Sequence, residues 1–207
     1  MVTVLLLLTA AASHSPAVRK CDPRGTELAV DTARSLVRWR GTKFWGLGSH
    51  EGTVRLRGGA ICVLDGKVRQ AWFEADMGTI DVTDIPADDP VPRRRLREHL
   101  RSADFFAVSE HPLARFVLRE AAVENGRLYR VSGDLTIRGR THPVTFYARG
   151  WTVTAGEVRA EARLRIDRHR YGVSYRGSTL RDDLVDDEFW LDLVIEARPR
   201  AVAASSR

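Results

Sequence analysis

The 207-residue sequence predicts an all-β domain, a closed antiparallel up-and-down barrel of about eight strands with one short helix inserted after a long loop. Apolar and polar residues alternate in about nine short runs, the pattern of strands with one buried face. Turn signals separate several runs, and such short connections join antiparallel neighbours. Several runs reach about ten residues, which is long for a sandwich and suits a barrel, whose closure removes exposed edges.

Each candidate strand places its apolar side chains at every second position. Turn signals follow or separate these segments at Gly58–Gly59, Asp65–Gly66, Asn125–Gly126 and Ala155–Gly156. In chain order the segments are SLVRWRG (35–41), EGTVRLRG (51–58), AICVL (60–64), RQAWFEADM (69–77), LARFVLR (113–119), YRVSGDLTIRG (129–139), PVTFYARG (143–150), VRAEARLRID (158–167) and EFWLDLVIEA (188–197).

The apolar face mixes very small with very large side chains. A barrel of about eight strands has room for one small ligand. Small inward residues therefore indicate either a taper filled by larger neighbours or an unfilled lumen, and the sequence does not choose between them. The small residues are Ala75, Ala114, Gly133, Ala148, Ala160 and Ala162, beside the large Phe73, Phe116 and Phe146.

One segment breaks the strand pattern. Residues 83–92, rich in Pro and Asp, predict a loop, and residues 93–106 predict a basic helix with an apolar stripe of Leu96, Leu100 and Ala103. Such an insertion would lie across the wall or mouth of the barrel. At its end, Phe105 and Phe106 either anchor the helix or close the mouth of the lumen.

The arginines of this helix also have two interpretations. They are either a solvated surface or a clamp for an anionic head group, because the planar guanidinium suits phosphate. The candidate head-group contacts are Arg94, Arg97 and Arg101.

No pattern of catalytic or metal-binding residues stands out. Motifs for nucleophilic hydrolases, zinc proteases and nucleotide-binding enzymes are absent, and the six histidines lack the spacing of metal ligands. The acidic run at 181–188 lacks the ligand spacing of a calcium loop and predicts a solvated loop. We therefore expect no catalytic residue, no metal and no cofactor.

The termini and the charge suggest an exported, non-nucleic-acid-binding protein. Residues 1–17 resemble a secretory signal, although no basic residue precedes the apolar run, and a misplaced start codon, which would leave the protein in the cytoplasm, is the alternative. No run is long enough for a membrane-spanning helix, and the net charge of +6 comes from scattered arginines. Cys21 and Cys62 form a disulfide if the chain is exported, or else Cys62 is a small core residue. The expected organisation is 1–27 signal and N-terminus, 28–199 barrel, and 200–207 tail.

The order of phrases along residues 29 to 197 resembles the YceI-like polyisoprenoid-binding proteins. The phrases are VDTARSLVRWRGTK, GSHEGTVRLRGG, FEADMGTIDVTD, HLRSADFFAVSEHPLARF, VSGDLTIRGRTHPVTF and LRIDRHRYGVSY, followed by a closing amphipathic strand. The first of them departs from the commoner His-Ser opening, which leaves the ligand's identity open.

The resemblance implies a lipocalin-like barrel that binds an amphiphilic isoprenoid, such as a polyprenyl phosphate or an isoprenoid quinone, without catalysis. Periplasmic or secreted localisation and a peripheral membrane contact are compatible with it, and the sequence leaves the oligomeric state open between a monomer and a dimer. Two alternatives stay open, an envelope stress-related interaction module and an enzyme acting on a hydrophobic substrate. The expected lumen residues are Trp39, Phe73, Met77, Phe116, Leu135, Phe146, Leu164 and Leu191, with Phe105 and Phe106 at the mouth.

Overall fold

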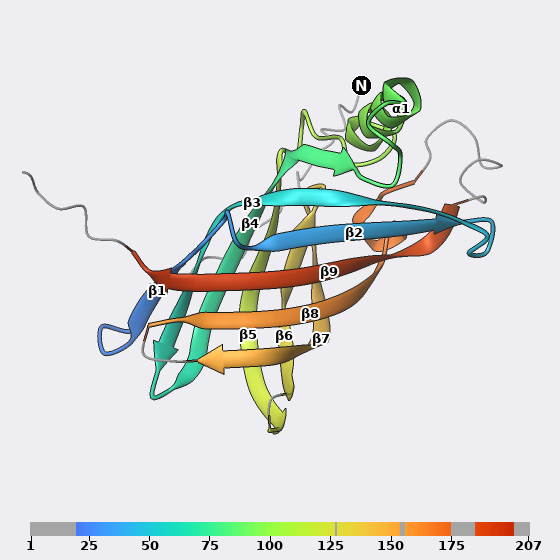
Figure 1. Cartoon of the computed structure of the whole chain (residues 1–207). Helices are drawn as coiled ribbons and strands as arrows, with labels where there is room; N and C mark the ends of the chain where they lie inside the picture. The colour runs from blue at the N-terminus through green and yellow to red at the C-terminus, as the bar shows by residue number, and fades with distance from the viewer. Residues whose placement is uncertain (1–19, 127, 154–155, 175–184, 201–207) are drawn as a thin grey trace, which may run out of the picture.

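The computed structural model describes residues 20–126, 128–153, 156–174 and 185–200, with the backbone alone for 150–152 (Figure 1). The predicted secretory signal and nearly all of the predicted tail lie outside these ranges. The elements are β1 (Thr26–Val30), β2 (Leu36–Lys43), β3 (Gly48–Leu64), β4 (Lys67–Val82), α1 (Pro90–Arg101), β5 (Leu113–Asn125), β6 (Leu128–Ile137), β7 (Arg140–Val153), β8 (Val158–Asp167), the single 3-10 turn η1 (His169–Tyr171) and β9 (Val185–Pro199).

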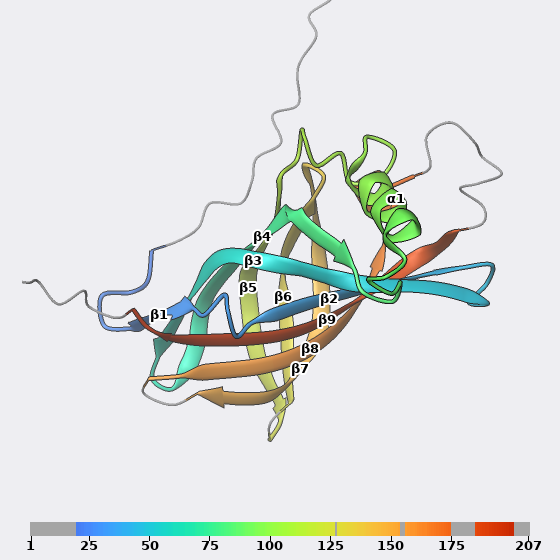
Figure 2. The same ribbon diagram turned by 45° about the horizontal axis from the view of Figure 1, so that its top comes forward.

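The strands form one closed antiparallel barrel, which confirms the predicted fold class. Neighbouring strands from β2 to β9 pair in sequence order, and β9 returns to β2 to complete the circuit. The nine strands fill eight positions, because β1 and β2 share the place between β3 and β9. Figure 2 shows the strands wrapping around one interior.

The short strand β1 has no counterpart among the sequence predictions. It contributes Leu28 and Val30 to the core, and its backbone pairs with β3 on one side and with β9 on the other. Five residues are too few to establish an alternating pattern, so this strand can be found only through its partners.

The turn predicted at Gly58–Gly59 is wrong, because both residues lie inside the continuous 17-residue strand β3. The pairing of β3 with β4 shifts register between Leu56 and Gly58, the signature of a β-bulge. A Cβ atom on Gly59 would lie 2.5 Å from the carbonyl oxygen of Trp72 and 2.9 Å from Val30. These glycines therefore let a long strand bend and let its neighbours approach.

Helix α1 begins three residues earlier and ends five residues earlier than predicted. Pro90 and Pro92 suit the first turn, where a missing N–H costs nothing, and Ser102 ends the helix by donating its hydroxyl to the carbonyl of His99 at 2.8 Å. Leu100 is buried and Leu96 half-buried, but Ala103 lies beyond the helix and is exposed, so the predicted stripe is one residue shorter. No helix of the described residues is long and apolar enough to cross a membrane.

Cys21 and Cys62 form a disulfide bond between the segment before β1 and strand β3. Cys62 is also buried, so it is both a disulfide partner and a small core residue. The bond ties the N-terminal segment to the barrel wall across 41 residues of sequence.

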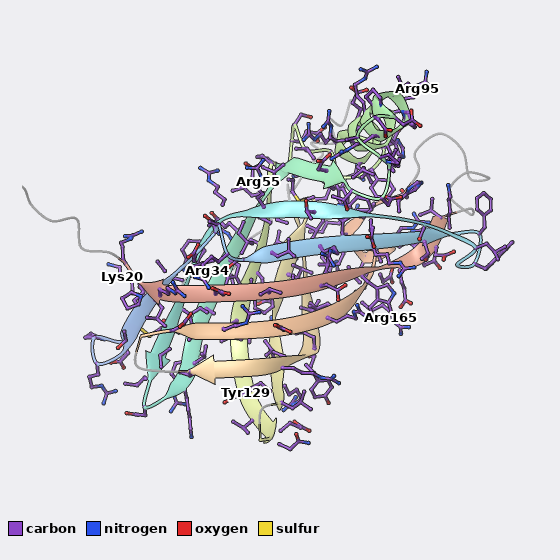
Figure 3. The ribbon with its side chains drawn as sticks, viewed as in Figure 1. Lys20, Arg34, Arg55, Arg95, Tyr129 and Arg165 are labelled. Atoms are coloured by element: carbon purple, nitrogen blue, oxygen red, sulfur yellow. A yellow bond between two sulfur atoms is a disulfide. The ribbon has the colours of Figure 1, made fainter. Side chains whose placement is uncertain are left out.

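The outer surface is lined with ion pairs between neighbouring strands. On β8 and β9, Arg163 lies 2.5 Å from Asp192 and Arg165 lies 3.0 Å from Glu188, and both guanidinium groups lie 5.9 Å from the ring of Trp190. Figure 3 shows Arg165 pointing away from the barrel, as expected for a solvated face. The predicted loop at 181–188 is wrong for residues 185–188, which belong to β9, and residues 181–184 lie outside the described ranges.

Candidate functional site: an apolar lumen

The barrel encloses a cavity of about 160 Å³. Its lining runs from Val158 to Leu164 along β8, which is about 20 Å of strand at ~3.3 Å per residue. The lining residues therefore extend along most of β8. An apolar cavity of about 150 Å³ in another protein stays dry and binds benzene, so a volume of this size is enough for an apolar ligand.

All eight side chains expected in the lumen line this cavity. They come from seven strands, and each strand contributes side chains from its inward positions. They are Trp39, Phe73, Met77, Phe116, Leu135, Phe146, Leu164 and Leu191.

Three phenylalanines lie next to one another in the lining, with Phe116 in contact with both of the others. The ring centroids of Phe73 and Phe116 lie 6.1 Å apart, and those of Phe116 and Phe146 lie 5.7 Å apart. Phe116 packs directly over Gly133, where an added Cβ would lie 2.4 Å from the ring. At this position, the small residue makes room for a large neighbour.

The small residues elsewhere leave space. Five alanines line the cavity, and their short side chains leave its volume open: Ala75, Ala114, Ala148, Ala160 and Ala162. Both interpretations of the small inward residues are therefore correct, one at Gly133 and the other at the alanines.

The lining carries almost no charge. Among its described residues only Arg115 is ionisable, and its guanidinium binds Glu74 on the neighbouring strand, with Nε 3.0 Å from the carboxylate. Trp39 donates its indole N–H to the carbonyl of Asp81 at 3.2 Å. The lumen can thus hold an apolar chain, but it offers no pair of ionisable groups for acid–base chemistry.

The two phenylalanines after α1 have different positions. Phe106 lines the cavity and contacts Phe189 on β9 at 6.5 Å between centroids. Phe105 is not part of the lining and packs between Phe106, at 5.1 Å, and His99, at 5.6 Å. Both rings contact the two clusters of buried side chains that make up the core, so this segment bridges them.

Two of the three candidate head-group arginines hold α1 against the barrel. Arg101 donates to the carbonyl oxygens of Gly78 and Ile80 on β4, and Arg97 lies 3.6 Å from the carboxylate of Asp81. Arg94 is exposed, and Glu98, at 3.9 Å, is its ion-pair partner. A head-group role for these residues stays a prediction.

None of the five histidines among the described residues lines the cavity. His50 lies 2.8 Å from Asp84, His169 lies 2.8 Å from Asp187, and burial lowers the pKa of His99 although the charge of Asp104 opposes this. No group of three or more metal-ligating side chains occurs among the described residues.

Sequence reasoning left several lining residues out of the expected set. Phe189, Leu193 and Ile195 line the cavity from β9, beside the predicted Leu191. The alternation that identified Leu191 points to all of them equally, so the pattern would have found them.

The sequence and the fold match known proteins. Residues 28–197 match the family model of the YceI-like domain. Curated relatives include a UPF0312 protein of Pseudomonas putida, 43% identical over 51 residues, and one of Photorhabdus laumondii, 45% identical over 51 residues. These alignments cover 25% of this chain and 27% and 26% of those relatives, so the chain matches about a quarter of their length.

Solved structures share the fold over most of the chain. BcnA of Burkholderia cenocepacia superposes with a TM-score of 0.64 at 21% identity, covering 81% of this chain and 99% of its own. A polyisoprenoid-binding domain from Saccharophagus degradans gives 0.58 at 15% identity, covering 84% and 98%. The YceI protein of Campylobacter jejuni gives 0.52 at 13% identity, covering 97% and 99%. With the family model spanning nearly the whole barrel, the chain belongs to the YceI-like family.

Proposed function

We propose that this chain binds the hydrocarbon tail of an amphiphilic isoprenoid lipid in its lumen and acts as a carrier or sequestering protein without catalysis. The observation that carries the proposal is the apolar cavity, whose lining extends over about 20 Å of β8 and can follow a hydrocarbon chain. Each CH₂ group removed from water contributes about 0.8 kcal/mol, so the part of the tail that enters the cavity needs no specific polar contact to bind. The polyisoprenoid-binding domain of Saccharophagus degradans has the same fold and supports this choice of ligand.

The head group would remain outside the apolar lining, because burying an unpaired charge there is costly. A polyprenyl phosphate or an isoprenoid quinone both satisfy this arrangement. Arg94 is the exposed arginine of the candidate set and is the one able to reach a phosphate without releasing α1.

We place the protein in the periplasm or outside the cell. The Cys21–Cys62 disulfide supports this, since such bonds persist in oxidising compartments, and so does the predicted secretory signal. In such a compartment the lumen would carry a water-insoluble lipid between membranes or withdraw it from them.

The test is to fill the lumen from one strand. Ala162 lines the cavity, whereas Glu161, the preceding residue of β8, is exposed on the outer face. Ala162→Phe should reduce the uptake of isoprenoid quinone or polyprenyl phosphate at least about tenfold, because the ring occupies the ligand's space. Glu161→Phe adds the same ring outside and should bind like the wild type.

Uptake would be followed by fluorescence titration and by mass spectrometry of solvent extracts from the purified protein. The proposal fails if folded protein yields no isoprenoid or other lipid and takes up neither probe. Equal uptake by Ala162→Phe and Glu161→Phe would place the binding site outside the lumen.

A further inference from the structure

The hairpin between β2 and β3 ends in an unusual surface. Trp45 is 87% exposed and Leu47 is 88% exposed, more than any other large apolar side chain among the described residues, and Phe44 is 39% exposed. Hairpin turns ordinarily carry Gly, Asn, Asp or Ser. We call residues 43–47 the aromatic tip.

The backbone of the aromatic tip is held in a conformation that its side chains disfavour. Phe44 and Trp45 have φ angles of 54° and 55°, in the left-handed region that bulky residues rarely adopt. The carboxylate of Asp186 on β9 accepts hydrogen bonds from the Trp45 N–H, at 3.0 Å, and from the Thr42 hydroxyl. The strand next to the hairpin therefore fixes the turn, and such strain persists where surrounding structure over-determines it.

The aromatic tip also projects from the molecule. Figures 1 and 2 both show the end of the β2–β3 hairpin extending beyond the barrel, at the end that carries α1. A convex apolar projection is buried only by a partner that surrounds it. A lipid surface does so without a preformed pocket, whereas a protein partner would need a matching cavity.

The chemistry of the tip fits the boundary between head groups and acyl chains. Trp and Phe are amphipathic or polarisable rings that favour this boundary, and Leu contributes apolar area. The Lys43 ammonium lies 5.8 Å from the centre of the Phe44 ring, at the base of the tip, where it can meet a lipid phosphate. Arg94 and Arg95 are exposed on α1 at the same end, and Figure 3 shows Arg95 on the outer side of the helix.

We propose that the aromatic tip inserts into the head-group region of a lipid bilayer and docks the barrel there by its α1 end. The apolar side chains supply most of the binding free energy. Electrostatic attraction to the lipids supplies less, because the exposed Asp88 and Asp89 beside α1 offset part of the positive charge of its arginines. The inference stands independently of the lumen's ligand, since the tip would bind vesicles that contain no isoprenoid.

The test is flotation of the full-length, oxidised protein with vesicles of phosphatidylethanolamine containing a minority of phosphatidylglycerol. Trp45→Ser combined with Leu47→Ser should weaken binding at least about tenfold, because both side chains leave the lipid. A matched control is Val123→Ser combined with Tyr147→Ser, which removes side chains that are 54% and 49% exposed elsewhere on the wall. The control should bind like the wild type.

Two further variants separate the alternatives. Lys43→Gln should weaken binding to these vesicles by about fivefold, the effect of one lysine near an anionic surface, and should leave binding to phosphatidylcholine vesicles unchanged. Ala162→Phe, which fills the lumen, should float like the wild type. Loss of ligand binding in the lumen and loss of membrane docking are therefore distinguishable.

The proposal is overturned if the wild type does not float, or if the Trp45→Ser/Leu47→Ser variant floats as well as the wild type. Thermal unfolding checks that the variant is folded, and its exposed substitutions should leave the midpoint unchanged. Sedimentation velocity without lipid tests a second copy as the occupant. A wild-type dimer that this variant abolishes would make the tip a contact between subunits and would also overturn the proposal.

Discussion

Tyr171 carries a buried hydroxyl group for which the described residues supply no hydrogen-bond partner. The side chain is 1% exposed within the cluster of Leu135, Ile137 and Leu164, and its ring meets that of His142 edge to face at 5.2 Å. Burial raises the pKa of this phenol to about 12, so it stays neutral. Its ring contributes packing while its hydroxyl contributes a desolvation cost.

Replacing Tyr171 by Phe should therefore stabilise the protein. An unsatisfied buried polar group costs about 1–3 kcal/mol, so the free energy of unfolding should rise by about 1 kcal/mol, while the ring contact with His142 is kept. Urea unfolding at neutral pH measures this as a higher midpoint with an unchanged slope. A lower midpoint would show that the hydroxyl has a favourable partner after all.

At the scale of elements, α1 depends on its arginines for its position. Beyond Asp76, where the pairing of β4 with β5 ends, β4 continues to Val82 and α1 packs on this extension. Arg93 lies 2.7 Å from Asp81. Burial acts to raise the pKa of the Asp81 carboxyl, but the hydrogen bonds from Arg93 and the Val82 N–H and the charges of Arg93 and Arg97 outweigh it and hold that pKa below its usual value.

Arg101→Gln should loosen α1, whereas Arg94→Gln should not. Arg101 bonds two carbonyl groups of β4, but Arg94 is exposed and pairs within the helix. Hydrogen exchange should show faster exchange across 90–101 in Arg101→Gln, with the strands unchanged. If Arg94 contacts a head group, Arg94→Gln should instead weaken the binding of polyprenyl phosphate relative to quinone. Equal exchange in both variants would contradict a docking role for Arg101.

The elements that sequence could predict are those with a long local pattern. Alternation placed the strands and their inward faces, including that of Leu164 on β8. The alternation gave a wrong prediction at residues 58 and 59, because a pair of glycines occurs in turns and in β-bulges alike. Only the pairing with β4 shows that these two lie at a bulge. The end of the helix was predicted wrongly for a similar reason. The hydroxyl of Ser102 caps the helix by a hydrogen bond, but nothing in the sequence distinguishes this serine from any other.

At the scale of the whole molecule, the sequence could predict which residues face the lumen but not whether the lumen is filled. The answer depends on where the rings of Phe73, Phe116 and Phe146 lie relative to one another and to Gly133, and these are contacts between strands far apart in the chain. The disulfide was undecided for the same reason. The spacing of the two cysteines does not show whether the fold brings residue 21 close to residue 62.

That disulfide should be a large part of the barrel's stability. It closes a loop with a sequence separation of 41 residues that contains β1 and β2, and a closed loop of this size stabilises by up to about 4 kcal/mol by restricting the unfolded chain. Combining Cys21→Ser with Cys62→Ser should lower the free energy of unfolding by about 2–4 kcal/mol.

Urea unfolding with and without reductant checks this prediction. Reductant should lower the midpoint of the wild type toward that of the double variant and leave the double variant unchanged. The slope should increase without the disulfide, because the unfolded chain then exposes more surface. Gly25 packs against the bridge, with an ideal Cβ only 2.9 Å from the Cys62 sulfur, so β1 should be the first strand to lose protection from hydrogen exchange. An unchanged midpoint would mean that strand pairing with β3 and β9 alone holds the N-terminal segment in place.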